Sequence, residues 1–331
     1  MRWITLLVVS IFWTACSNEP SDLTLSFYHW KSIPDKPSGV VAYLDQVDNQ
    51  HIHYRIFDLV QQGEEIVPVA DAALDTVLLQ NRTFTACIFI TNACFKTNSQ
   101  VEELARKTWF KIQDKLSKAA LLEQCIEIQI DCDWTAGTRS AYFEYLTALK
   151  NLLPDSIALT ATIRLHQVRY PAETGIPPVE RGALMCYNMG DIQDMDEINS
   201  IFSLDILKTY LLDNMSYPIP LDIALPAFDW YLVYRDNKLF KIIHEPEDNL
   251  TALLQDQSSV ILDADQYVAG HYLYRGDYIK FEEVQVEDLQ VALEYINRTK
   301  LKTGKYLLFY HLNTALTTKL PNEIIQQLVH P

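Results

Sequence analysis

The sequence lacks the motifs with which proteins commonly hold nucleotides, dinucleotides and structural metals. It has no G-x-G-x-x-G and no G-x-x-x-x-G-K-[ST] run, which gives no support to a nucleotide-dependent or dinucleotide-dependent enzyme. It also has no C-x-x-C pair and no histidine at zinc-ligand spacing from a cysteine. We therefore expect neither a metal site nor a cofactor.

Positive charge is scarce. The chain has 27 Lys and Arg against 43 Asp and Glu, a formal net charge of -16, and no basic cluster offsets this excess. Such a surface repels phosphate backbones, so we expect no nucleic-acid partner.

Glycine and sequence repeats are also scarce. With 9 glycines, 14 prolines, no low-complexity tract and no internal period, the composition excludes a largely disordered chain and a solenoid. At 331 residues and 49% hydrophobic, the chain is the size of one large barrel domain, which we expect to be a monomer.

The first residues are typical of an export signal. Arg2 precedes an apolar stretch at 4–13, and Thr14 and Ala15 form a small-residue cleavage site before Cys16. The stretch is shorter than the roughly 20 residues that span a bilayer. It resembles a bacterial lipoprotein signal, although Trp13 replaces the usual leucine.

The resemblance implies a signal peptide at 1–15, a lipid on Cys16 and a polar tether at 16–23. The membrane would then be a partner through this lipid, and the protein would lie in the cell envelope, at the outer membrane. An ordinary secretory peptide, with Cys16 incidental, is the alternative.

The remaining cysteines lie mostly within apolar runs and are expected to be buried free thiols, with a bridge between Cys87 and Cys94 left open.

Short apolar or aromatic runs alternate with helical periods, as in parallel sheets covered by helices. The predicted strands are 24–30, 53–59, 86–92, 126–133, 158–166, 183–189, 222–228 and 306–313, and the clearest helices are 101–123 and 138–153. We predict a single (β/α)8 barrel over 24–331 in the α/β class, with an α+β insertion at about 230–283, after the seventh strand.

Polar residues alternate along the fourth predicted strand. Because side chains two apart share a face, Gln129, Asp131 and Asp133 are expected to project together into the barrel mouth. Carboxyl groups this close raise one another's pKa, which suits acid–base chemistry. The alternative is a solvated strand end whose acids cap the next helix.

Three segments resemble the motifs of the chitinase-like family 18 glycoside hydrolases, in order and on the expected strands. QIDCDW at 129–134 matches the family's D-x-D-x-E, LMCYNMG at 184–190 its M-x-Y-D or M-x-Y-N, and ALPAFDW at 224–230 its LP-aromatic segment. The resemblance implies a general acid at the end of the first motif, which protonates the glycosidic oxygen, and implies that Tyr187 holds the substrate's N-acetyl group.

Thr135 stands where the family has its acidic glutamate, and threonine cannot be a general acid. Either Asp133 is the acid, with Gln129 and Asp131 in the preceding places, or the acid comes from elsewhere, or the barrel binds without cutting. Asp58, Asp191 and Asp229 are candidates for a second carboxylate, with a helix cap or loop acid as the alternative for each.

Aromatic and polar residues near the predicted strand ends suit a sugar, because pyranose faces stack on aromatic rings. The predicted substrate-binding residues are Gln129, Trp134, Tyr187, Asn188, Tyr28, Trp30, Asp229, Trp230, His166 and Tyr310, with Asp131 and Asp133 as catalytic residues. Barrel filling is the alternative for each single aromatic residue.

Two hypotheses follow. The first is an exported, lipid-anchored glycoside hydrolase that acts on an oligo- or polysaccharide, with Asp133 as the preferred acid. The second is a lipoprotein that binds a glycan without cutting it. Thr135 favours the second, and the paired Asp131 and Asp133 favour the first.

Overall fold

The structure is a computed structural model of the 331-residue chain. It describes residues 23–32, 38–96, 100–244, 248–254, 257–268 and 270–329. The predicted signal peptide and Cys16 lie outside the described residues.

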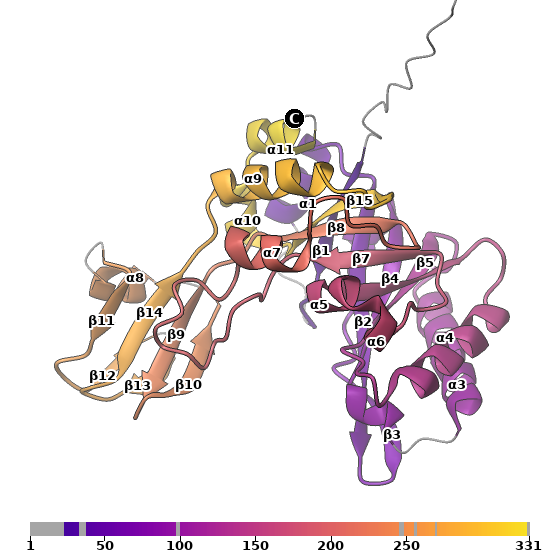
Figure 1. The fold of residues 1–331 in the computed structure, drawn as a ribbon, viewed down its shortest axis with the longest axis horizontal. Coiled ribbons are helices and arrows are strands. Elements are labelled where there is room, and N and C mark those ends of the chain that lie inside the picture. Colours follow the sequence, from indigo (N-terminus) through magenta and orange to yellow (C-terminus); the bar gives the residue numbers. More distant parts are fainter. Residues whose placement is uncertain are drawn as a thin grey trace, which may run out of the picture.

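Parallel strands close into a barrel at the centre of the molecule (Figure 1). The strand order is β1, β2, β4, β5, β6, β7, β8, β15, and β1 pairs with both β2 and β15, so the ring is complete. The bounds are Thr24–His29, His51–Gln62, Thr83–Ile90, Cys125–Asp131, Ala158–Arg164, Arg181–Met185, Leu221–Pro226 and Thr303–Tyr310, in that order. Each predicted strand is found in this ring, and the predicted (β/α)8 fold is confirmed.

Helices cover the outside of the barrel (Figure 1). They are α1 Ser38–Gln46, α2 Thr76–Leu79, α3 Val101–Lys118, α4 Arg139–Leu152, α5 Leu165–Arg169, α6 Pro171–Thr174, α7 Leu204–Tyr210, α9 Val286–Asn297, α10 Thr314–Lys319 and α11 Asn322–Val329, with a 3-10 turn η1 at Asn92–Phe95. In α3, Leu104, Ile112 and Leu116 are buried, as the helical period predicts. No helix in the described part of the chain is long and apolar enough to cross a membrane.

An ion cluster fills the middle of the barrel. Arg181 on β7 donates from Nη2 to Glu127 Oε2 at 2.5 Å and from Nε to Asp222 Oδ2 at 2.6 Å. Glu127 also accepts a bond from Thr160 on β6, and Asp222 accepts the backbone N–H of Tyr306 on β15. The cluster therefore ties five neighbouring strands together from inside, β5 to β8 and β15.

An α+β insertion separates β8 from α9 and projects to one side of the barrel (Figure 1). Its main sheet has the antiparallel order β10, β9, β14, β11, and β12 pairs with β13 alongside. The bounds are β9 Trp230–Arg235, β10 Lys238–Ile243, α8 Asp248–Leu254, β11 Ser259–Ile261, β12 Gln266–Val268, β13 His271–Leu273 and β14 Tyr278–Glu282. The insertion has a hydrophobic core of its own, which includes Val233, Leu273 and Ile279. A second antiparallel extension, β3 (Glu65–Val69), pairs with β2.

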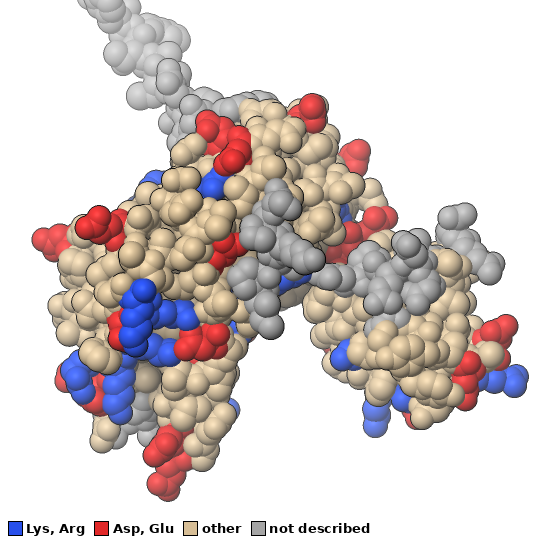
Figure 2. All heavy atoms as spheres, turned by 180° about the vertical axis from the view of Figure 1, so that it is seen from behind, with Lys and Arg blue, Asp and Glu red and all other residues tan. Residues whose placement is uncertain are grey.

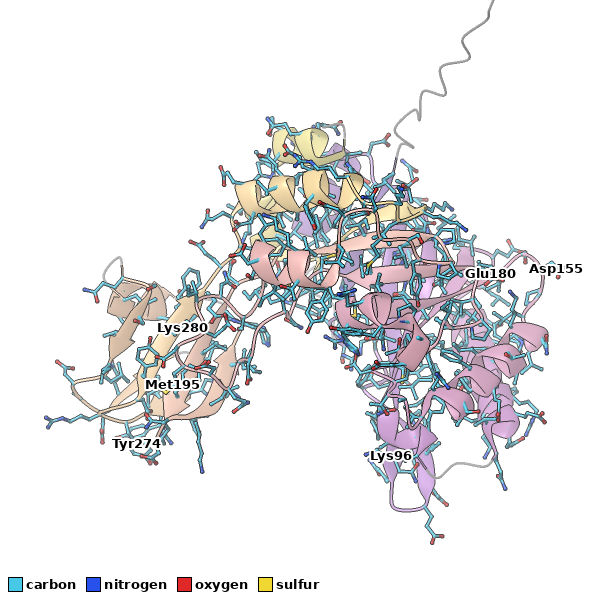
Figure 3. All side chains as sticks on the ribbon, in the orientation of Figure 1. Lys96, Asp155, Glu180, Met195, Tyr274 and Lys280 are labelled. Atoms are coloured by element: carbon cyan, nitrogen blue, oxygen red, sulfur yellow. The ribbon has the colours of Figure 1, made fainter. Side chains whose placement is uncertain are left out.

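Glu282 anchors the insertion to the loop that follows β7. Its Oε2 accepts from Trp230 Nε1 at 2.9 Å and from the backbone N of Ser200 at 2.9 Å, and its Oε1 lies 2.7 Å from Lys280 Nζ. Lys280 of β14 also donates to the carbonyl of Glu197 in this loop, and Figure 3 labels Lys280 and, in the same loop, Met195. This loop is thus hydrogen-bonded to the insertion.

The five described cysteines are free and buried. The prediction of buried free thiols is confirmed for these five residues. The bridge left open between Cys87 and Cys94 is not formed.

Gly304 offers a test of how closely β15 packs on the ion cluster. A Cβ at this position would lie 2.5 Å from the backbone N of Asp222 and 2.6 Å from the carbonyl carbon of Leu221. Because backbone atoms cannot yield as a flexible side chain does, we expect Gly304→Ala to lower the free energy of unfolding by about 1–3 kcal/mol. Urea unfolding followed by circular dichroism measures the change.

Gly39→Ala in α1 is the control, because nothing lies within 4 Å of a Cβ there. Alanine favours a helix over glycine, so this variant should be neutral or up to about 1 kcal/mol more stable. Equal unfolding midpoints for the two variants would contradict the close approach of β15 to β8.

Candidate functional site

A pocket of about 140 Å³ lies at the carboxyl ends of the barrel strands. It is lined by Tyr28, Trp30, Asp131, Thr162, Arg164, Met185, Tyr187, Asn188 and Tyr310. These residues come from β1, β5, β6, β7, β15 and the segments directly after β1 and β7. This is the end of a (β/α)8 barrel where active sites are found.

Asp131 is the one acid among these lining residues. The residue is 9% exposed, and its Oδ1 accepts a hydrogen bond from Thr162 Oγ1 at 2.7 Å. Burial raises the pKa of Asp131 to about 6, against the opposing effect of the Thr162 bond and with a further increase from the charge of Asp133. Both the protonated and the ionised form of this carboxyl group are therefore populated at pH values near 6.

Aromatic rings form the walls around Asp131. Tyr187 stacks on Tyr310 with a centroid separation of 5.1 Å and an interplanar angle of 23°. Trp30 packs edge-on against Tyr28, and each of these two lies 6.0 Å from Tyr310. The rings are thus one connected group that presents apolar faces and phenol hydroxyls to the pocket.

Trp30 is held from behind by an ion pair. Arg55 on β2 donates to the Trp30 carbonyl at 3.1 Å, and its guanidinium lies 5.6 Å from the centre of the indole ring. Asp58 accepts from Arg55 Nε at 2.7 Å. Asp58 is therefore outside the pocket lining and supports a wall instead of serving there as a second carboxylate.

Solved structures share this architecture. A chitinase from Chromobacterium violaceum matches 93% of this chain and 99% of its own, with a TM-score of 0.53 and 12% identity. The spore cortex-lytic enzyme SleL from Bacillus megaterium matches 91% and 73%, with a TM-score of 0.55 and 10% identity. A family 18 chitinase from Flavobacterium johnsoniae matches 93% and 94%, with a TM-score of 0.50 and 12% identity.

The fold is that of a chitinase-like TIM barrel. At these identities the likeness establishes the fold alone. No family model matches the sequence, and the search of curated proteins gave no match.

Within the chitinase-like barrel, the structure gathers six of the residues predicted from the sequence into one pocket. They are Tyr28, Trp30, Asp131, Tyr187, Asn188 and Tyr310. Asn188 adopts a φ of 53°, a left-handed conformation that asparagine tolerates better than most residues. The other predicted residues lie elsewhere.

Asp133 does not project into the mouth beside Asp131. β5 ends at Asp131, so the alternation of side chains that placed the two acids on one face stops before Asp133. Both Asp133 oxygens accept bonds from Arg164, at 2.6 and 2.8 Å, and the side chain is 50% exposed. Of the two predicted catalytic acids, Asp131 lines the pocket and Asp133 does not.

Gln129 and Trp134 are packing residues. Gln129 is fully buried one layer below the pocket, where its Oε1 accepts the Tyr28 hydroxyl at 2.6 Å. Trp134 is 1% exposed, stacks on Tyr142 of α4 and donates to the Thr174 carbonyl. Neither side chain belongs to the pocket lining, although both were predicted to bind substrate.

The remaining predicted residues lie outside the pocket lining. Asp229 pairs with Lys319 at the start of the insertion, and Trp230 is 5% exposed and bonded to Glu282. His166 is exposed on α5, because β6 ends at Arg164 and not at residue 166. Asp191 is an exposed loop acid that accepts the backbone N–H of Gln193.

In the described chain, no group of three His, Cys, Asp or Glu residues is arranged to hold a metal ion.

Three lining residues, Thr162, Arg164 and Met185, were not among the predicted substrate-binding residues. Thr162 is the one that bonds Asp131. It belongs to no motif, and a threonine in a strand is more often a β-former than a ligand contact. The available signal was the alternation of Thr160, Thr162 and Arg164 along one strand, which places three polar side chains on the barrel's inner face.

The raised pKa of Asp131 predicts a specific pH dependence of stability. Between about pH 4 and 6 the unfolded chain loses this proton before the folded chain does, so the group lowers stability as pH rises through that window. Asp131→Asn removes the ionisation and keeps an acceptor for Thr162. We expect the variant to gain about 1–3 kcal/mol over the wild type at pH 7 and little at pH 3.5.

Urea unfolding of both proteins at several pH values gives this difference directly, since all other titrating groups are common to the two. Asp133→Asn serves as the control, because it removes a half-exposed partner of Arg164 and should bring no gain at pH 7. A constant difference between wild type and Asp131→Asn across the window would rule out preferential protonation of Asp131.

Proposed function

We propose that this protein acts on an oligo- or polysaccharide at the barrel mouth, as a divergent glycoside hydrolase in which Asp131 is the general acid. The observation that carries the proposal is a buried carboxyl group with a pKa of about 6, enclosed by aromatic side chains. A group with this pKa can hold a proton and release it near neutral pH. The names of the structural neighbours, chitinases and a spore cortex-lytic enzyme, support the same substrate class.

One acid in the pocket limits the mechanism. A hydrolase that uses a carboxylate nucleophile or a carboxylate base needs a second acid at a defined separation, whereas substrate-assisted enzymes use a carbonyl oxygen of the substrate itself. Asp58 and Asp133 both lie outside the pocket lining, and each is paired with an arginine. The partner of Asp133, Arg164, itself lines the pocket. The arrangement therefore fits a substrate whose own acyl group attacks while Asp131 protonates the glycosidic oxygen.

Tyr187 is the residue we assign to that acyl group. Burial raises the pKa of its phenol well above the ordinary value, so the hydroxyl stays protonated and can donate a hydrogen bond. This role agrees with the one that the family resemblance implies for the same residue.

Glycan binding without hydrolysis is the second candidate, and Thr135 is the observation that favours it. Thr135 is hydrogen-bonded to Thr138. Its backbone N donates to Thr138 Oγ1 at 3.0 Å, and its hydroxyl lies 3.3 Å from the same oxygen. The position that carries the acid in the family is thus part of the turn that begins α4.

A glycan panel scored for both binding and product release separates the two candidates. It would contain N-acetylated and non-acetylated oligosaccharides and peptidoglycan strands. For the hydrolase we expect turnover of N-acetylated chains that falls as pH rises through about 6, because Asp131 must be protonated. Asp131→Asn should lower kcat by at least about a hundredfold, the usual range for loss of a general acid, and retain binding.

Asp133→Asn is the matched variant and should keep most of the turnover, with a smaller loss through the freed Arg164. Binding by every protein with product from none would leave only the second candidate. Turnover that survives in Asp131→Asn would show that the proton comes from another group.

We further propose that the protein is exported and anchored in the cell envelope, at the outer membrane, by a lipid on Cys16. The support is the sequence alone: Arg2, the apolar stretch at 4–13 and the small residues before Cys16. A single cysteine with two or more acyl chains would provide stable membrane binding.

Replacement of Cys16 tests this directly. We expect the wild type to incorporate labelled palmitate and to fractionate with membranes, and Cys16→Ser to lose the label and become soluble outside the cytoplasm or remain as an uncleaved precursor. Cys87→Ser, at a buried thiol of the barrel, is the control and should keep the label. Palmitate on the Cys16→Ser protein would exclude this anchor.

A further inference from the structure

A strip of exposed aromatic side chains crosses the insertion, outside the pocket lining. We define the outer strip as Tyr267, Tyr272, Tyr274, Arg235 and Phe240. The four aromatic residues are 69%, 52%, 47% and 48% exposed, in the order Tyr267, Tyr272, Tyr274, Phe240. Figure 3 shows Tyr274 near the end of the insertion that lies away from the helices α7 and α9.

The outer strip is continuous from residue to residue. Tyr267 on β12 and Tyr272 on β13 are directly opposite each other in an antiparallel pair, which puts both rings on one face. The Tyr272 and Tyr274 rings lie 5.2 Å apart. The Arg235 guanidinium is 4.4 Å from the centre of Tyr274 and 3.9 Å from that of Phe240.

Buried contacts hold the outer strip in this arrangement. Arg235 donates two bonds to Asp277, at 2.9 and 2.7 Å, and Asp277 is 2% exposed and also accepts the backbone N–H of Tyr274. The residues next to the tyrosines in sequence, Val268 and Leu273, lie in the insertion's core. A shift of register by one residue would bury the tyrosines and expose this core, so the outward direction of the rings is fixed by the fold.

A connected patch of exposed aromatic side chains, held in one arrangement by buried contacts, is typical of an interaction site. The chemistry narrows the ligand: tyrosine rings with hydroxyls, and an arginine whose charge is balanced by a buried aspartate, suit a neutral polyhydroxylated chain. Acidic and basic side chains are mixed at this end of the insertion (Figure 2), and the formal net charge is -16, so neither anionic lipid nor nucleic acid is attracted.

We propose that the outer strip is a second carbohydrate-binding surface, which holds an extended glycan chain by stacking of successive sugar rings. The class of ligand rests on the proposed function. Figure 2 shows an open hollow between the insertion and the barrel. One long polymer that contacts both the outer strip and the pocket gains from effective concentration, whereas a short oligosaccharide contacts one of them at a time.

Retention of the full-length protein on insoluble chitin, cellulose and peptidoglycan sacculi tests the proposal. Tyr267→Ala, Tyr272→Ala and Tyr274→Ala should each weaken binding to the preferred polymer by about threefold to tenfold, as expected for loss of one stacking ring, and the triple variant should lose most of it. Phe110→Ala is the matched control, because Phe110 is 68% exposed on α3 of the barrel. Equal melting temperatures for all variants would exclude unfolding as the cause of any loss.

Three results would overturn the proposal: no polymer retained by the wild type, equal retention of the wild type and the triple variant, or an equal loss in Phe110→Ala. Strip-dependent binding to phosphatidylethanolamine–phosphatidylglycerol vesicles in the absence of polymer binding would assign the surface to lipid and overturn it as well.

Asp131→Asn separates this proposal from that of the hydrolase. It should lose product release from short soluble oligosaccharides and still be retained on the polymer through the outer strip. If the wild type releases no product but its retention depends on the tyrosines, the hydrolase proposal fails and the outer strip stands. If product is released and retention does not depend on them, the outer strip fails alone.

Discussion

The ion cluster around Arg181 is the constraint on which the barrel depends. Glu127 and Asp222 are both nearly fully buried, and each finds its positive partner in the same guanidinium. Removal of one partner from such a cluster leaves an uncompensated charge in a medium of low polarity, at a cost of about 3–5 kcal/mol. Because its members lie on neighbouring strands, the cluster also fixes the register in which those strands meet.

Above the cluster, towards the mouth, the polar side chains inside the barrel have fewer hydrogen-bond and ion-pair partners. The next layer holds the Tyr28–Gln129 hydrogen bond, and the top layer holds Asp131, whose one side-chain hydrogen bond comes from Thr162. The carboxylates below are ion-paired, whereas Asp131 has burial without a cation bonded to it. Burial raises the pKa of all three carboxyl groups, and Asp131 is the one of them that lines the pocket.

Much of this arrangement was accessible from the sequence. The apolar runs predicted every strand of the barrel, and the rule that active sites form at strand carboxyl ends brought Tyr28, Tyr187 and Tyr310 to the same place as Asp131. The periodicity of β5 correctly placed Gln129 and Asp131 on the inner face. What it cannot give is the residue at which a strand ends, and the misplacement of Asp133 and His166 has this single cause. The depth of a residue along the barrel axis is likewise absent from periodicity, and for this reason Gln129 was expected in the mouth and lies beneath it.

The two walls of the mouth are held by different parts of the molecule, one by the barrel and the other through Glu282 of the insertion. Trp30 on one side is held by Arg55 and Asp58, which belong to the barrel itself. Asn188 on the other side begins the loop whose Ser200 is bound by Glu282 of the insertion. The shape of one wall of the mouth therefore depends on how the insertion packs, because Ser200 is bonded both to Glu282 and to Gly190 beside Asn188, whereas the Trp30 wall is held from within the barrel.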